Sequence, residues 1–267
     1  MNGQGFELVC EVEPPTRPDL VHVRHQIGVL SKVASAFLIP DNHLGRATVS
    51  SVAVAHEVAA MGGRSIACLN GRDRNRLGLR RDLLTAAAYG VDQFLLVAGD
   101  RRADEPAGLG VRTMVDEIRT FGATERFAGH PPFRVGATTR LGPLAPFKAQ
   151  ADFLFVQMSF DVDALVAWRE DLVFDGPVYA GVMVLASAAM AARVAGQIGE
   201  MTIPAAVLDQ LARDPGCGVD LACEQVEAIE ASGAFEGVHL VPVSRYRQVA
   251  ARLEASGRQD GWDSVVR

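Results

Sequence analysis

The chain has 267 residues, of which 49 % are apolar and 22 % are charged, and its net charge is −6. This composition is typical of a soluble globular protein, and the length suits one α/β barrel or two smaller domains. The negative charge argues against general affinity for nucleic acid or an anionic membrane surface, so we expect neither as a partner.

No segment resembles an export or membrane signal. The N-terminus lacks a basic stretch before an apolar core, and the most apolar run, residues 176–192, is shorter than the roughly 20 residues of a membrane span. The four cysteines show no CxxC pair and no metal-ligand spacing. Cys10 and Cys68 lie in apolar runs, where a free thiol behaves as a small hydrophobe. We expect a cytoplasmic protein without a structural metal.

Eight short apolar or β-branched runs recur along the chain, and helical patterns follow them. Their nearly continuous apolar character is expected of parallel strands that are covered on both faces. The runs span residues 6–13, 32–39, 64–70, 93–99, 133–139, 153–160, 177–184 and 237–243.

The segments between the runs predict helices with recognisable ends. Residues 74–90 form one helical pattern, with Leu77, Leu84, Ala87 and Ala88 near the spacing of an apolar face and Gly90 as its stop. Asp161 is a candidate N-cap for the helix after the sixth run.

The repeats predict one closed (β/α)8 TIM barrel that spans residues 1–267. The proline-rich stretch GPLAPFKAQ after the fifth run predicts a short or irregular element there. An open doubly wound sheet is the alternative, but no GxGxxG follows the first run, which disfavours a Rossmann fold.

In a barrel of this kind the active site lies at the carboxyl ends of the strands. The polar side chains in the last part of the runs or just after them are therefore the candidate site residues. They are Glu11, Glu13, Asp41, Asn42, Asn70, Arg72, Asp100, Gln157, Ser244 and Arg245.

At these positions the chain resembles the methylenetetrahydrofolate reductase family. The shared motifs are CEVEPP around Glu11, DRNRLGLRRDLLTAAAYG in the third unit, Gly99-Asp100, Gln157 in FLFVQMSFD, and Arg245 after the eighth run. The resemblance implies a TIM-barrel oxidoreductase of one-carbon metabolism, with methylenetetrahydrofolate as substrate and NAD(P)H as reductant. We expect a monomer or a small homo-oligomer.

The chain departs from flavin-containing members of that family at contacts with FAD. Such members carry a histidine where this chain has Ser65, and an arginine or threonine where it has Ala98. Their Tyr-Pro-Glu-x-His-Pro segment is replaced by TTRLGPLAP, and an aromatic residue is replaced near Ala188. This pattern resembles the short flavin-independent branch from actinobacteria, which implies direct reduction by NADH, or by NADPH, without FAD.

Two other functions stay open from the sequence. The first is the ordinary flavin-dependent reductase, with FAD held by different contacts. The second is a catalytically silent barrel that serves as a partner subunit, although acids at its mouth would then have no physical purpose.

Reduction of the substrate needs an acid near the nitrogen that leaves when the five-membered ring opens. Glu11 sits in an apolar strand that Pro14 and Pro15 follow, and it is the predicted general acid. Glu13 follows two residues later on the same face and is the second candidate. The alternative for either side chain is a solvated position on the rim of the barrel.

Asp100, Gln157 and Arg245 are predicted to contact the substrate, Arg245 because the family resemblance implies it. Asp100 can accept hydrogen bonds from the pterin ring or support a developing cation, unless it only caps a turn. Gln157 offers both a donor and an acceptor, which suits an amide-rich pterin or nicotinamide.

Five arginines follow the third run, which is unusual in an acidic chain. Arg72 and Arg74, with Asn70 beside them, are candidate cofactor-binding residues that can pair with a pyrophosphate or with folate carboxylates. A solvated helix start is the alternative for both arginines. Arg80 and Arg81 are expected to cover the outer helix face or to pair with Asp82.

For each of two remaining titratable residues the sequence allows a functional and a structural role. His43 follows the second run and is either a cofactor contact or a solvated loop histidine. Glu57 lies in an otherwise apolar helical pattern and is a second proton-handling candidate, with an exposed helix stripe as its alternative.

Overall fold

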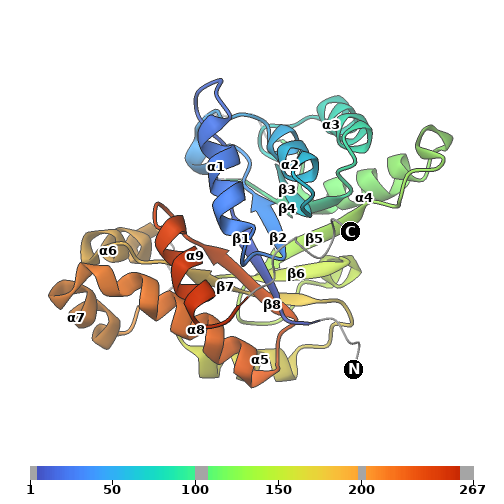
Figure 1. The fold of residues 1–267 in the computed structure, drawn as a ribbon. Helices are drawn as coiled ribbons and strands as arrows, with labels where there is room; N and C mark the ends of the chain where they lie inside the picture. The colour runs from blue at the N-terminus through green and yellow to red at the C-terminus, as the bar shows by residue number, and fades with distance from the viewer. Residues whose placement is uncertain (1–4, 100–107, 198–202, 259–267) are drawn as a thin grey trace.

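The computed structural model describes residues 5–99, 108–197 and 203–258. Their strands pair in sequence order into a closed parallel barrel, in which β8 completes the ring against β1 (Figure 1). The strands are β1 (Glu7–Glu11), β2 (Ala36–Ile39), β3 (Ser65–Asn70), β4 (Gln93–Val97), β5 (Arg134–Thr139), β6 (Phe153–Val156), β7 (Val178–Met183) and β8 (Gly237–Val241). The predicted (β/α)8 barrel is confirmed, and the doubly wound sheet is wrong.

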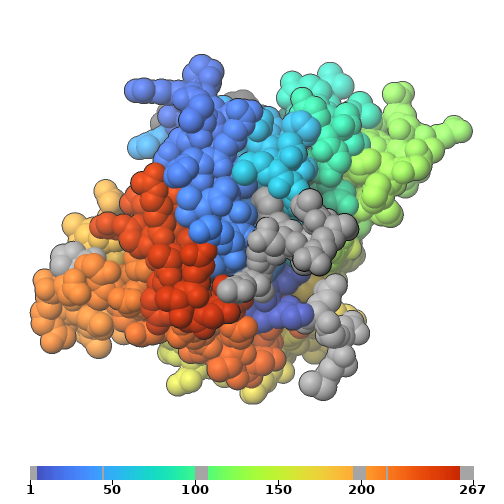
Figure 2. Space-filling view, in the orientation of Figure 1, coloured from blue at the N-terminus to red at the C-terminus, as the bar shows by residue number. Residues whose placement is uncertain are grey.

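Helices surround the barrel, and α1 packs beside α9, so that the beginning and the end of the chain lie side by side (Figure 2). The α-helices are α1 (Val21–Leu30), α2 (Ser51–Ala60), α3 (Arg76–Ala88), α4 (Val111–Gly122), α5 (Val162–Asp171), α6 (Ala188–Gln197), α7 (Ala205–Arg213), α8 (Gly218–Ser232) and α9 (Tyr246–Ala255). The 3-10 helices are η1 (His43–Gly45), η2 (Glu125–Phe127), η3 (Pro146–Gln150) and η4 (Pro215–Cys217). Within the described ranges, no helix has the length and apolarity needed to cross a membrane.

Alternation along the strands divides the buried apolar side chains into two sets. One set, which includes Val9, Cys68 and Phe155, fills the inside of the barrel, and a larger set lies between the strands and the helices. Gly136 makes room for an aromatic ring, because a Cβ there would lie 1.9 Å from the ring of Phe153. The barrel is therefore a packed core rather than a pore, and a ligand can enter only at its end.

The connection between β5 and β6 contains η3 and no α-helix, as the prolines predicted. Trp168 of α5 fastens this connection, since its indole N–H donates to the carbonyl oxygen of Gly142 at 2.9 Å. The connection between β7 and β8 is longer and adds α6 and α7 before α8. Figure 1 shows these two helices beside α8, outside the ring of helices.

The ends of α3 and α5 follow local capping rules. Asn75 accepts from the backbone N–H of Gly78 at 2.8 Å, and Gly90 takes a positive φ of 71° just beyond α3. Asp161 caps α5 as predicted, accepting from Ala164 N at 2.9 Å.

The predicted apolar face of α3 is wrong. Leu77 is 77 % exposed and Leu84 is 42 % exposed. The buried residues are Leu79, Leu83 and Ala86, which form the other apolar stripe of this helix. Both stripes have helical spacing, so only packing against the barrel decides between them.

Candidate active site

A cavity of about 600 Å³ opens at the carboxyl ends of the strands, and we call it the mouth cavity. This volume lies within the range of small-molecule sites. Apolar side chains of the barrel interior, among them Leu38, Leu95 and Phe155, form its floor. The polar residues of its wall are Glu11, Asp41, Asn42, His43, Asn70, Arg72, Thr138, Thr139, Arg140, Lys148, Gln157 and His239.

Glu11 is the last residue of β1, and its side chain lies on the face of that strand that points into the barrel. Val9 lies two residues earlier in the interior cluster, so Glu11 points the same way, one layer closer to solvent. Glu11 Oε2 lies 3.3 Å from His239 Nε2, and the two side chains are 22 % and 10 % exposed. Glu13 lies beyond the strand, is exposed and does not line the mouth cavity.

His239 is a site residue that the sequence reasoning missed. It pairs in register with Val9 across the β1–β8 seam, and its ring stands edge-on to Phe155 with centroids 5.3 Å apart. In the run GVHLVPV it looks like one more core position. One feature of the sequence could have indicated it. His239 is a titratable residue at an inward-facing position of the eighth strand, and in a closed barrel that strand pairs with the first strand, which carries Glu11.

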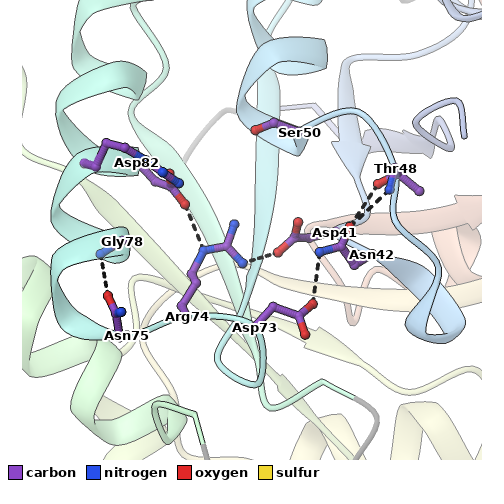
Figure 3. Close-up of a pocket in the computed structure, with 10 residues that line it drawn as sticks. Asp41, Asn42, Thr48, Ser50, Asp73, Arg74, Asn75, Gly78 and Asp82 are labelled. Carbon is purple, nitrogen blue, oxygen red and sulfur yellow. Dashed lines mark hydrogen bonds and ion pairs between the residues drawn. The ribbon is translucent and has the colours of Figure 1, made fainter. Parts of the chain in front are cut away.

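Arg74 is held in a pocket beside the mouth cavity, between two aspartates (Figure 3). Its guanidinium donates to Asp41, to Asp82 Oδ2 at 2.9 Å and to the carbonyl oxygen of Asn70 at 3.0 Å. Burial acts to lower the pKa of Arg74, but attraction by Asp41 and Asp82 outweighs it and raises that pKa. Arg74 therefore fastens β2 and β3 to α3 and does not line the mouth cavity, contrary to the prediction of a cofactor contact.

Asn70 lines the mouth cavity, but both ends of its amide are engaged within the protein. Its Nδ2 donates to Asp41 Oδ2 at 2.7 Å, and its Oδ1 accepts from the backbone N–H of Asp73 at 3.0 Å. These hydrogen bonds order the ends of β2 and β3. Asn70 is only 1 % exposed, so it has little surface with which to contact a cofactor.

Arg72 lies in the wall of the mouth cavity, as predicted. Its Nε and Nη2 donate to the two carboxylate oxygens of Asp73, at 2.6 and 2.7 Å. Chiefly through this contact, and with help from Asn42 and Asn70, the pKa of Asp73 is held well below its usual range. Gly99 has a φ of 79°, and a Cβ there would lie 3.0 Å from Arg72 Cβ, so glycine suits this turn.

The other three arginines of the cluster also have carboxylate partners. Arg76 and Arg80 both pair with Glu117 of α4, and Arg81 pairs with Asp82, the latter as predicted. The concentrated positive charge is thus compensated locally by acids from α3, α4 and the mouth loops.

A family model described as methylenetetrahydrofolate reductase matches residues 8–257, from the second residue of β1 to just beyond α9. The chain belongs to the methylenetetrahydrofolate reductase family. Membership in this family implies an oxidoreductase. No curated protein matches the chain by sequence.

Many solved structures resemble this reductase-family barrel, among them the following two. A protein from Clostridium thermocellum that binds two copies of 5-methyl-5,6,7,8-tetrahydrofolic acid is 11 % identical, with a TM-score of 0.64 over 95 % of this chain and 96 % of that one. Oxaloacetate acetylhydrolase in complex with 3,3-difluorooxalacetate is 12 % identical, with a TM-score of 0.49 over 95 % and 79 %. At such low identity, likeness shows the fold alone.

Several of the family motifs meet at the mouth cavity. Gln157 follows β6 directly, with its backbone N–H donating to Thr139 O at 2.8 Å, and it lines the cavity together with Glu11 and His43. Asp100 lies outside the described residues, although Gly99 before it is described. Arg245 stands at the start of α9 and does not line the mouth cavity, so its predicted substrate contact has no support from its position.

Glu57 lies on the outside of the barrel, away from the mouth cavity. Its carboxylate receives two hydrogen bonds from the guanidinium of Arg24 on α1, at 2.6 and 3.0 Å. This pairing lowers the pKa of Glu57, which favours a permanently charged group. The position and the partner both oppose the predicted role in proton handling.

Among the departures from flavin-containing members, Ala98 lines the mouth cavity and Ser65 does not. Ser65 is the first residue of β3, at the opposite end of the barrel, where its hydroxyl donates to Ala55 O at 3.4 Å. Ser65 therefore has no bearing on the cofactor. Ala188 begins α6 and packs against the small apolar cluster of that helix.

Proposed function

We propose that this protein reduces 5,10-methylenetetrahydrofolate to 5-methyltetrahydrofolate with a hydride taken directly from NADH. The observation that carries the proposal is the carboxylate of Glu11 in the mouth cavity, 3.3 Å from His239, in a chain of the reductase family. The Clostridium thermocellum protein of similar fold binds 5-methyl-5,6,7,8-tetrahydrofolic acid, the product of this reaction, which agrees with the proposal.

Glu11 acts as the general acid. It gives a proton to the nitrogen that departs when the five-membered ring of the substrate opens, which leaves an electrophilic carbon on the other nitrogen. NADH, when bound, supplies the hydride that this carbon accepts. His239 Nε2 lies 3.3 Å from Glu11 Oε2, close enough to return a proton to Glu11 between turnovers.

Other wall residues orient the two ligands. The amide of Gln157 can donate to and accept from a pterin or a carboxamide, and His43 and Arg72 stand on the opposite side of the opening. The apolar floor formed by Leu95 and Phe155 keeps water from the reacting carbon, which favours hydride transfer over hydrolysis.

The wall of the mouth cavity lacks two features that the family resemblance assigns to FAD binding in flavin-containing members. Thr138, Thr139 and Arg140 occupy the wall where those members have their Tyr-Pro-Glu-x-His-Pro segment, and the connection that follows contains only η3. The methyl group of Ala98 stands where they have a longer polar side chain. These features support a reaction without a flavin.

An isotope experiment tests the proposal. Flavin-free protein is incubated without oxygen with methylenetetrahydrofolate and NADH that carries deuterium at the transferred position, and the product is analysed by mass spectrometry. Direct transfer places deuterium in the methyl group of the product. Loss of the label to water, or turnover only after FAD is added, would contradict direct transfer, since a reduced flavin exchanges its hydrogen with solvent.

A further inference from the structure

The wall of the mouth cavity carries opposite charges on opposite sides. Glu11 ends β1, whereas Arg140 and Lys148 follow β5, and these two strands face each other across the eight-stranded ring. All three side chains line the same cavity. A ligand whose reacting end lies at Glu11 therefore points its other end toward two cations.

Lys148 is a cation without a carboxylate partner among the described residues. It lies on η3, half-buried, with its Nζ 5.9 Å from the ring of Phe147, which Arg112 approaches from α4 at 5.5 Å. Burial, and then the nearby charge of Arg140, lower the pKa of Lys148. An ammonium group that lines a cavity and has no carboxylate partner in the described part of the chain can pair with an anionic group of a ligand.

The chain uses lysine rarely, which makes Lys148 stand out. Of its 26 basic residues only Lys32 and Lys148 are lysines. Lys32 has an ordinary surface environment, with a side chain that is 62 % exposed and an ion pair to Glu254 at 3.3 Å. It is therefore an internal control for any experiment on lysine chemistry.

We propose that Lys148, with Arg140 beside it, binds the anionic end of a ligand whose reacting end lies at Glu11. This inference rests on the proposed function and adds the orientation of a ligand in the site. The anion is either a carboxylate from the glutamate part of the folate or the diphosphate of the dinucleotide, and a cation pair binds both kinds of group.

Trace acylation of amines tests this proposal on the intact protein. The protein is treated briefly with acetic anhydride near pH 8, and the acetylation of Lys148 relative to Lys32 is measured by peptide mass spectrometry. We expect Lys148 to be protected by inorganic diphosphate, while Lys32 is not. Of the two larger probes, protection by ADP-ribose but not by p-aminobenzoylglutamate assigns the anion to the dinucleotide, and the reverse result assigns it to the folate. No protection by any of the three probes would overturn the proposal.

Substitutions separate this inference from the proposed function. In Lys148→Gln we expect KM for one ligand to rise by about 10-fold or more, with recovery in Lys148→Arg and no change in Lys32→Gln. Equal KM values in wild type and Lys148→Gln would overturn the inference while the reductase function stands. If the protein reduces no folate, the protection by inorganic diphosphate still decides on Lys148.

Discussion

The carboxylate of Glu11 and the imidazole of His239 approach within 3.3 Å, although they belong to the first and the last strands of the chain. Closure of the barrel brings them together, because β1 and β8 pair in parallel with Val9 opposite His239. Both side chains border the mouth cavity above the apolar floor. The proton source of the proposed reaction is thus assembled by the topology of the fold.

Replacement of His239 tests whether it assists Glu11. His239→Phe fills the same space without a polar atom, and we expect kcat to fall by about 10- to 100-fold with less effect on KM for NADH. His239→Gln keeps an N–H group and should retain more activity. Steady-state kinetics over a range of pH gives kcat and KM. Equal kcat in His239→Phe and wild type would show that His239 does not assist Glu11.

Arg74→Met should destabilise the protein strongly. It leaves Asp41, whose side chain is 4 % exposed, and Asp82 without their shared cation, and loss of one partner of a buried ion pair costs about 3–5 kcal/mol. The free energy of unfolding is measured by urea denaturation.

Arg81→Ala is the matched control, since the Arg81 side chain is 76 % exposed and its loss should change that free energy by less than about 0.5 kcal/mol. If Arg74→Met had normal stability and a raised KM for NADH but not for the folate, Arg74 would be a cofactor contact.

Glu57→Gln should leave catalysis nearly unchanged. Its carboxylate faces Arg24 on the outer surface, so the substitution breaks an ion pair between α1 and α2 and reaches no ligand. We expect kcat within about two-fold of wild type together with a small loss of thermal stability. A large fall in kcat with unchanged stability would show that Glu57 takes part in catalysis.

Asp73 makes stability depend on pH in a defined direction. Its pKa is lowered in the folded state, mainly by Arg72, so the folded protein resists its protonation more than the unfolded chain does. The stability that Asp73 adds is complete above its unfolded pKa of about 4 and is lost as the pH falls below that value. The difference in unfolding free energy between wild type and Asp73→Asn should therefore shrink in acid, and a constant difference would contradict this linkage.

The sequence was most informative where a local rule decides the structure. Continuous apolar runs predicted the strands, prolines predicted the irregular connection that became η3, and Asp161 met the requirements of an N-cap. The placement of Glu11 also follows from local information, because alternation along a strand in a barrel sets which side chains face the mouth.

Other features depend on partners that are distant in sequence. Arg74 looked like a mouth residue because it follows β3, but Asp41 comes from the end of β2 and draws it into a structural pocket. Glu57 looked unpartnered until α1 placed Arg24 against it. His239 and Lys148 gave weak signals, since one lies in an apolar run and the other in a proline-rich loop, and only barrel closure brings them to the same cavity.

The turnover of Glu11→Gln tests the central claim most directly, with Glu13→Gln as the matched control on the same segment. Glu11→Gln should bind NADH and folate but lose turnover by about 100-fold or more, because an amide cannot supply the proton. Glu13 is exposed outside the cavity, so Glu13→Gln should react at the wild-type rate. Near-normal turnover in Glu11→Gln, measured as methyltetrahydrofolate formed from NADH, would contradict the account.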